Sequence, residues 1–331
     1  MGDIVLNVED VSVKYPGRDG LITVVDQVSL SMNAGDSLVI AGESGSGKSM
    51  ICQALLGIVP GAGQVSGTRI EWRGKNLLEL GEPEWKSVRG SEIAMIFQDP
   101  TAALNPLITV GNQLIDVIRT HKRCSRSQAK ERAIESLELA GFTEPKQQLR
   151  RYSSQLSGGM RQRVAIALAL SCEPSLIIAD EATSNLDVSI QAKIVSLLHD
   201  LKEKLGLALI FVTHDLSLAA EIGGNLLVMY SGNMVEYGPV QSVLKNPTHP
   251  YTKGLLQSAP TMHSTRDNPL RPIPGQAPKP GTLGAGAPFV ARCPVAVAGV
   301  CDRKRPSWTE VDTAHRVACH RFELDKQGAY R

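Results

Sequence analysis

Residues 42–49 read Gly42-Glu43-Ser44-Gly45-Ser46-Gly47-Lys48-Ser49 and fit the pattern G-x-x-x-x-G-K-[ST]. A short apolar run, Ser37 to Ala41, precedes them and is typical of a buried strand in a parallel sheet. A helical pattern follows from Ser49 to about Leu56. Glycines let successive N–H groups converge on phosphate oxygens, and the next helix offers its positive end to the same phosphates. The stretch therefore predicts an α/β fold that binds a phosphorylated ligand.

The last two residues of this loop carry its chemistry. Lys48 is expected to neutralise charge on the β- and γ-phosphates, and Ser49 to offer its hydroxyl to Mg²⁺. The alternative is an ordinary glycine-rich turn, which the flanking strand and helix disfavour. The loop alone leaves several classes open, because small-molecule kinases, GTPases and motor ATPases share it.

Strand and helix patterns are distributed on both sides of the loop. Residues 4–13 and 24–32 predict strands, and residues 107–172 are mainly helical in pattern. A strand, a helix and a second strand are then predicted at 176–179, 188–205 and 207–213. This order is typical of a parallel α/β unit.

Two acids end the first strand of that unit. Asp180 at the strand tip is placed to hold Mg²⁺ through water, and Glu181 is placed to polarise an attacking water as a general base. An ordinary strand followed by charged turn residues would give the same pattern. The pair therefore supports phosphoryl chemistry only together with the loop.

The stretch Leu156-Ser157-Gly158-Gly159-Met160 leads into an apolar helix and narrows the class. It predicts a second helix N-terminus with small residues and free N–H groups, and hence a second anion site. One nucleotide does not need two such sites from one chain. The arrangement makes sense if this site serves an ATP bound on another subunit.

Taken in order, these motifs resemble those of ATP-binding cassette (ABC) ATPases, over residues 4 to about 260. The resemblance implies a RecA-like P-loop nucleotide-binding domain with an antiparallel β-subdomain and a helical subdomain at about 107–172. It also implies ATP and Mg²⁺ as ligands. Tyr15 is similar to the aromatic that stacks on adenine, although a surface aromatic at a strand end is an equal alternative.

The same resemblance gives roles to two polar residues. Gln98 is similar to the glutamine that touches Mg²⁺ and the attacking water, and His214 to the switch histidine that contacts the γ-phosphate. The implied catalytic residues are Lys48, Glu181 and His214. The implied magnesium ligands are Ser49, Gln98 and Asp180. The implied ATP contacts are Tyr15, Gly42, Glu43, Ser44, Gly45, Ser46, Gly47, Lys48, Ser49, Gln98, Ser157, Gly158 and Gly159.

Three positions depart from the family pattern. Met160 stands where the signature usually has glutamine, Ala182 replaces the usual proline after Glu181, and Asn185 occupies a small position of the loop Ser184–Asp187. The last change therefore bears on how that loop packs between subunits.

Two further stretches, Asp99–Pro106 and Asn246–Leu256, resemble the peptide and nickel importer branch of the family. Both would otherwise be turn-rich loops. Residues 267–288 are rich in proline and glycine and predict an extended crossing to a small C-terminal unit at about 287–325. This tail resembles the C-terminal extension of oligopeptide and dipeptide ATPase subunits.

Three cysteines in the tail, Cys293, Cys301 and Cys319, raise the question of a metal. Some relatives hold a four-iron four-sulfur cluster there on four cysteines, but Ala287 lies where the fourth is expected. His315 or His320 are possible substitutes, and zinc on three cysteines and a histidine is also reasonable. Three options stay open: unmetallated packing cysteines, an iron–sulfur cluster, or zinc.

Cys52 and Cys172 lie in apolar helical patterns and are expected to be core residues.

Composition limits the alternatives. A net charge of +2 favours neither a nucleic-acid binder nor an acidic-lipid binder. No apolar run approaches the about 20 residues that span a bilayer. An acidic start without an apolar segment disfavours a secretory signal. We expect a peripheral protein at the cytoplasmic face of the inner membrane.

The resemblance implies a subunit that powers import of peptides or similar solutes. Its expected partners are a second ABC ATPase subunit, often a related but different chain, two transmembrane permease subunits and an extracytoplasmic solute-binding protein. We expect a nucleotide-binding domain at 1–245 and the extension at 246–331. The competing hypotheses are a soluble ABC ATPase of translation or DNA repair, a small-molecule kinase, an exporter ATPase, and an importer of nickel or another non-peptide solute.

Overall fold

The structure of the protein is a computed structural model, and it describes residues 3–258, 270 and 272–326. The chain divides into two compact units. The first comprises the N-terminal residues through Ile4, Met32–Asp36 and Glu79–Val212. The second comprises Val5–Ser31, Ser37–Leu78 and the described residues from Thr213 onward.

An antiparallel sheet begins the second unit. Its order is β2-β1-β5-β6, with β4 also pairing with β1. Leu6 lies opposite Trp72 in the register, and both side chains are fully buried. The predicted strands are confirmed, and both are longer than expected. The strands are β1 (Ile4–Gly17), β2 (Gly20–Asn33), β4 (Gln64–Ser66), β5 (Arg69–Trp72) and β6 (Lys75–Asn76).

The strand before the phosphate loop lies in a second sheet region of this unit. All five residues of β3 (Ser37–Ala41) are buried, as its apolar run predicts. It pairs in parallel with β10 (Asn225–Tyr230), which pairs antiparallel with β11 (Asn233–Pro239). The associated helices, of which α9 and α10 pack against these strands, are α1 (Lys48–Leu55), α9 (Ser217–Ile222), α10 (Val240–Lys245) and α11 (Pro250–Ser258).

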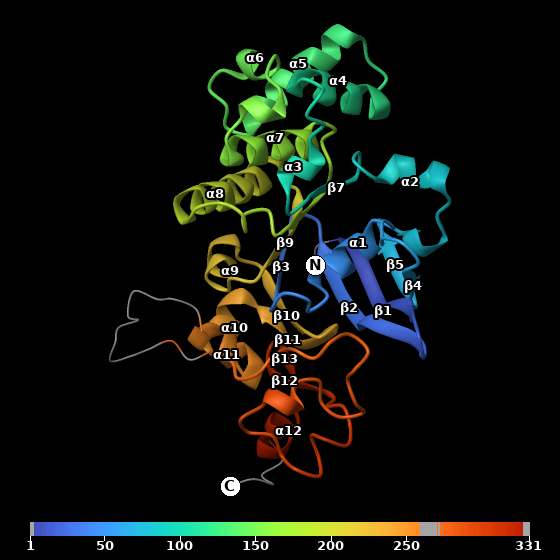
Figure 1. Ribbon diagram of the computed structural model, residues 1–331, viewed down its shortest axis with the longest axis vertical. Coiled ribbons are helices and arrows are strands. Elements are labelled where there is room, and N and C mark those ends of the chain that lie inside the picture. The colour runs from blue at the N-terminus through green and yellow to red at the C-terminus, as the bar shows by residue number, and fades with distance from the viewer. Residues whose placement is uncertain (1–2, 259–269, 271, 327–331) are drawn as a thin grey trace. The chain divides into compact units, whose positions relative to one another are not determined.

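The C-terminal tail is built onto the same sheet (Figure 1). Strand β13 (His315–Ala318) pairs antiparallel with β11, and β12 (Trp308–Asp312) pairs with β13. The remaining elements are η3 (Val290–Arg292) and α12 (His320–Lys326). The described part of residues 267–288 contains no helix or strand, as its prolines predict. The predicted boundary at 245/246 remains a prediction.

A buried carboxylate joins the tail to the segment before α11. Glu236 on β11 is 0% exposed. It accepts hydrogen bonds from the backbone N–H groups of Thr248, at 2.7 Å, and His249, at 3.1 Å. His315 on β13 lies 2.9 Å from the same carboxylate through its Nε2. These three partners satisfy a group that would be costly to bury alone.

The first unit holds the parallel strands predicted after residue 175. Strands β7 (Ile93–Ile96), β8 (Leu176–Asp180) and β9 (Ala208–Thr213) pair in parallel in the order β9-β8-β7. Helix α8 (Val188–Leu205) connects β8 to β9 and has the predicted bounds.

The predicted helical stretch at 107–172 is confirmed, and its helices appear in green in Figure 1. Helices α4, α5 and α7 pack on one another. The caps follow from sequence, since Thr109 and Ser125 accept hydrogen bonds from the first turns of α4 and α5. The unit's other helices are α2 (Glu82–Val88), α3 (Pro100–Ala103), α4 (Val110–His121), α5 (Arg126–Leu139), α6 (Pro145–Gln148), η2 (Ser153–Gln155) and α7 (Gly158–Leu170). The short helix η1 (Leu77–Glu79) contains the point in the sequence where the chain passes from the second unit to the first.

Candidate active site

The phosphate loop connects β3 to α1, as its pattern predicts. Gly47 precedes the first turn of α1 with φ 97°. A Cβ atom there would lie 3.1 Å from the carbonyl oxygen of Val24. A side chain at Gly42 would collide with the carbonyl oxygen of Met229. Glycine is therefore required at both positions by the backbone path and by close neighbours.

Polar groups inside the loop are arranged for an anion. Lys48 is 3% exposed, and its Nζ donates to the carbonyl oxygens of Gly42 and Glu43 at 2.9 Å each. The hydroxyl of Ser46 is buried and has no hydrogen-bond partner within the described residues. An orphaned buried hydroxyl beside a lysine and a helix N-terminus fits a bound phosphate group.

Tyr15 and His214 also fall in the second unit. The Tyr15 hydroxyl donates to the carbonyl oxygen of Pro60 at 3.1 Å and lies 3.5 Å from the sulfur of Met50 on α1. His214 follows β9 and is exposed. The turn after it is fixed by Asp215, whose N–H donates to the Thr213 hydroxyl at 2.9 Å. Their predicted contacts with adenine and γ-phosphate remain predictions.

The acidic pair lies in the first unit, at the end of β8. Asp180 is 4% exposed. Glu181 has a positive φ of 44°, which turns the chain sharply out of the strand. Its N–H donates to the carbonyl oxygen of Val212 at 3.1 Å and anchors that turn. Ala182 is 2% exposed, so a small residue fills the position where the family usually has proline.

Gln98 and Glu181 are brought together although they are 83 residues apart in the chain. The Gln98 amide donates to Oε2 of Glu181 at 3.1 Å and lies 3.5 Å from the Ser184 hydroxyl. The side chain of Asn185 reaches the Gln98 carbonyl oxygen at 3.5 Å. The departure at Asn185 therefore supplies an extra polar contact to the segment that carries Gln98.

The signature stretch forms the predicted helix N-terminus. Ser157 caps α7, because its hydroxyl accepts from the N–H of Met160 at 3.4 Å. Ser157 and Gly158 are exposed, whereas Gly159 is buried, where an added Cβ would lie 3.0 Å from Ile190. The exposed end of α7 could therefore meet a ligand carried by another chain.

The tail cysteines do not fit a metal. Within residues 3–258, 270 and 272–326, no group of three or more His, Cys, Asp or Glu side chains is arranged to hold one. Burial raises the pKa of the Cys293 and Cys319 thiols. Cys52 and Cys172 are fully buried, which confirms their prediction as core residues.

Neither candidate substitute histidine is turned to the cysteines. Both ring nitrogens of His320 are engaged, with Glu323 at 2.8 Å and with the Lys304 carbonyl oxygen at 2.9 Å. His315 faces Glu236. Ala287, where a cysteine was expected, donates its N–H to the Cys301 carbonyl oxygen at 2.8 Å. Within the part of the chain that the structure describes, neither the iron–sulfur option nor the zinc option is provided with a set of ligands.

Two contacts of the phosphate loop were missed from the sequence. Arg292 forms an ion pair with Glu43, with Nη1 2.7 Å from Oε2. The hydroxyl of Tyr251 accepts a hydrogen bond from the Glu43 N–H at 2.7 Å. Both residues stand in segments singled out only by resemblance, and no local pattern signals that they would meet residue 43.

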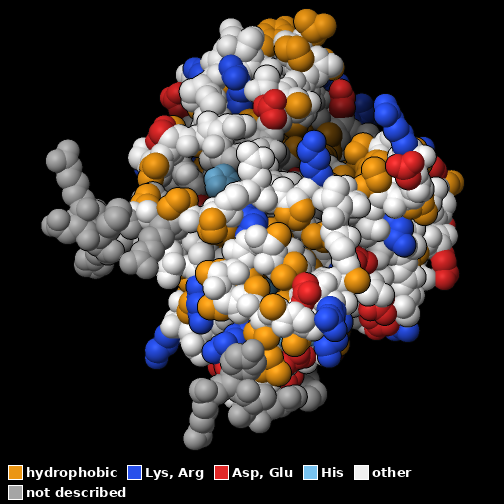
Figure 2. Space-filling model, turned by 60° about the horizontal axis from the view of Figure 1, so that its bottom comes forward, with side chains coloured by type: hydrophobic (Ala, Val, Ile, Leu, Met, Phe, Trp, Pro, Cys, Tyr) orange, Lys and Arg blue, Asp and Glu red, His pale blue; other side chains and the backbone are white. Residues whose placement is uncertain are grey.

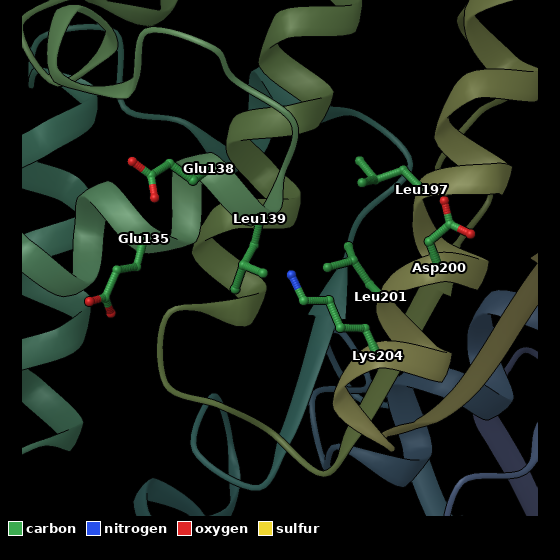
Figure 3. A pocket seen from close by; sticks show the side chains of 7 residues that line it. All are labelled: Glu135, Glu138, Leu139, Leu197, Asp200, Leu201 and Lys204. Carbon is green, nitrogen blue, oxygen red and sulfur yellow. The ribbon is translucent and has the colours of Figure 1, made fainter.

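A hollow elsewhere in the first unit contains none of the predicted site residues. It has a volume of about 480 Å³ and lies between α5 and α8 (Figure 3). Its lining side chains are Glu135, Glu138, Leu139, Leu197, Asp200, Leu201 and Lys204.

On the face drawn in Figure 2, basic and acidic side chains are interspersed. None of the helices among the described residues combines the length and apolar character that crossing a membrane requires.

Comparison with known proteins agrees with this arrangement. The model of the ABC transporter family matches residues 25–184, and that of the oligopeptide/dipeptide transporter C-terminal region matches residues 235–301. A probable peptide ABC transporter ATP-binding protein of Sinorhizobium fredii is 42% identical over 96% of this chain and 95% of its own. The oligopeptide transport ATP-binding protein OppD of Escherichia coli is 42% identical over 92% of this chain and 89% of its own.

Solved structures give the same result for the fold. The cassette cbiO1 of Clostridium perfringens, part of an ABC transporter complex, has a TM-score of 0.64 at 27% identity, covering 74% of this chain and 92% of its own. A dimeric bacterial ABC transporter cassette, MJ0796, has a TM-score of 0.60 at 30% identity, covering 71% of this chain and 98% of its own. This chain belongs to the family of ABC transporter ATP-binding proteins.

Proposed function

We propose that this chain binds and hydrolyses ATP to power the import of peptides or related small solutes through a membrane ABC transporter. One observation carries the proposal. A single chain joins the phosphate loop, the Gln98–Glu181 contact and the capped helix α7 to a C-terminal region matching that of oligopeptide/dipeptide transporters. Full-length relatives named for peptide transport support the same cargo class.

Each residue of the site has its own role in binding or hydrolysing ATP. Residues Gly42 to Ser49 cradle the phosphates, Lys48 neutralises their charge, and Tyr15 stacks on adenine. Glu181 takes the proton of the attacking water, with Gln98 beside it holding the carboxylate in place. His214 contacts the γ-phosphate.

Magnesium would be held by Ser49, Gln98 and Asp180, and it supplies neutralisation of charge on the phosphate oxygens when bound. Hydroxyl, amide and carboxylate oxygens are the ligands that Mg²⁺ prefers. The buried Asp180 carboxylate at the end of β8 fits this donor set.

The helix N-terminus at Ser157, Gly158 and Gly159 contacts an ATP that is bound by a second cassette. The two cassettes close on ATP and separate after hydrolysis, and this motion drives the membrane subunits. The partners are that second ATPase, identical or related, two permease subunits and an extracytoplasmic solute-binding protein. The chain is peripheral, at the cytoplasmic face of the inner membrane. Its nucleotide-binding domain occupies 1–245, with helices at 107–172, and the extension occupies 246–331.

Affinity purification from host membranes tests the transport assignment. The tagged chain is extracted in mild detergent and its companions are identified by mass spectrometry, with the variant Lys48→Ala as a control for nucleotide-dependent capture. We expect two multi-span proteins, a second cassette and a solute-binding protein whose ligand class is peptides. Ribosomes or DNA-repair factors in their place would overturn transport, and a nickel-binding partner protein would overturn the peptide cargo.

A further inference from the structure

The first side chain of the phosphate loop is tied to the C-terminal region. Glu43 receives a two-pronged ion pair from Arg292, with Nη1 2.7 Å from Oε2 and Nη2 3.0 Å from Oε1. Its backbone N–H is fixed as well, because it donates to the Tyr251 hydroxyl. All three residues belong to the second unit. Side chain and backbone of one loop residue are thus held by two residues from beyond position 250.

Arg292 is itself rigidly held. Its side chain is 5% exposed. Its Nε donates to the Pro274 carbonyl oxygen at 2.8 Å, and Nη1 lies 3.4 Å from the Tyr230 hydroxyl. The guanidinium stands 5.7 Å from the ring centre of Tyr230 and 5.9 Å from that of Phe289. A planar fork fixed in this way can set the direction of a carboxylate, which a flexible lysine cannot do.

Tyr251 is equally fixed. It is 0% exposed, and its ring packs edge-on to Tyr230, with ring centres 4.7 Å apart. Phe289 lies 5.3 Å from the same ring. The hydroxyl that accepts from Glu43 therefore stands on a packed aromatic cluster formed by Tyr230, Tyr251 and Phe289.

A carboxylate in a loop that binds a triphosphate would repel the ligand unless its charge is neutralised. Arg292 neutralises Glu43. The tie extends one step further, since the Glu43 carbonyl oxygen accepts a hydrogen bond from Lys48 Nζ at 2.9 Å. A continuous chain of contacts thus runs from the C-terminal region through Glu43 to the lysine of the loop.

We propose that Arg292 and Tyr251 are positioning residues of the ATP site. They hold Glu43 so that its charge is neutralised and Lys48 is presented to the phosphates. The inference rests on the proposed role of residues 42–49 in binding ATP, and it assigns to the C-terminal extension a direct influence on nucleotide affinity.

A double-mutant cycle on the full-length chain tests this. Binding of fluorescent ATP and steady-state hydrolysis are measured for Arg292→Gln, Arg292→Lys, Glu43→Gln and the double variant Glu43→Gln/Arg292→Gln. We expect Arg292→Gln to weaken ATP binding about tenfold, because truncating one partner strands a partly buried carboxylate. Arg292→Lys should be intermediate. The double variant should bind ATP within about threefold of wild type, since no unpaired charge remains. Throughout, kcat should change much less than KM.

Controls separate this outcome from loss of folding. Arg321→Gln removes the Arg321–Asp325 ion pair, 3.2 Å, from the same tail and should leave ATP affinity unchanged. Tyr251→Phe should weaken binding by about threefold, the loss of one hydrogen bond. Thermal unfolding confirms that each variant is folded at the assay temperature. The inference is overturned if Arg292→Gln binds ATP like wild type, or if Glu43→Gln fails to restore its affinity. Wild type that binds ATP without hydrolysing it would instead refute the proposed function.

Discussion

Replacing Glu181 by glutamine removes the proposed base while keeping its neighbours in place. Oε2 of Glu181 accepts from the Gln98 amide at 3.1 Å. The glutamine amide oxygen can accept the same hydrogen bond, so shape and contact survive. The change therefore keeps the outline of the side chain but removes the negative charge of the carboxylate, and with it the ability to take a proton from water.

The size of the effect follows from that restriction. General base catalysis contributes about 10²–10⁴-fold, or about 3–5 kcal/mol in the barrier. We expect kcat to decrease by a factor in that range. ATP affinity should stay within about threefold of wild type, because the phosphate loop is unchanged.

Turnover is measured by phosphate release and affinity by fluorescent ATP. Glu135→Gln provides a matched control, since Glu135 is an exposed carboxylate on α5 in the hollow without site residues. The control should hydrolyse ATP like wild type. Unchanged hydrolysis by Glu181→Gln would remove Glu181 from the role of base. A large loss of ATP affinity in this variant would show that the residue acts in binding instead.

Three further outcomes are expected. Lys48→Ala should weaken ATP binding itself by about tenfold or more, because the only cation in residues 42–49 is lost, and normal affinity by calorimetry would refute its role. Burial lowers the pKa of His249 to about 4. As the pH falls below about 6.5, the imidazole is therefore protonated in the unfolded chain but stays neutral in the folded one. The free energy of unfolding consequently decreases between about pH 6.5 and pH 4. Urea unfolding should therefore show about 2 kcal/mol less stability at pH 5 than at pH 7 from this residue, a loss that His249→Asn should not show. Protein purified without oxygen should contain no stoichiometric iron or zinc by elemental analysis, and one metal per chain would contradict the account of Cys293, Cys301 and Cys319.

The sequence predicts what is encoded locally. Strand β3 and the phosphate loop follow from an apolar run and a glycine spacing within short windows, and α8 has the bounds that the strand–helix–strand pattern predicts. The resemblance to the ABC family added Gln98, which the structure places against Glu181, and its implied roles at Mg²⁺ and at the attacking water stay predictions.

The remaining features depend on contacts between distant parts of the chain. Glu43 and Arg292 are 249 residues apart, and either residue alone looks like an ordinary charged side chain. The pairing of β13 with β11 sets Val317 opposite Glu236, a register that no short pattern encodes. The extension beyond residue 13 of β1 was also missed, because Tyr15 and Pro16 interrupt the alternation there.

The shared carboxylate of Glu236 limits how this protein can be shortened. A gene fragment that stops at residue 245 would encode β11 without Thr248, His249 and His315, and so without all three groups that satisfy Glu236. An isolated cassette cut at that point would carry an exposed sheet edge and a stranded acid, and would be prone to aggregate. For this chain, we therefore expect a fragment that keeps the C-terminal extension to fold and stay in solution better than one that ends at residue 245.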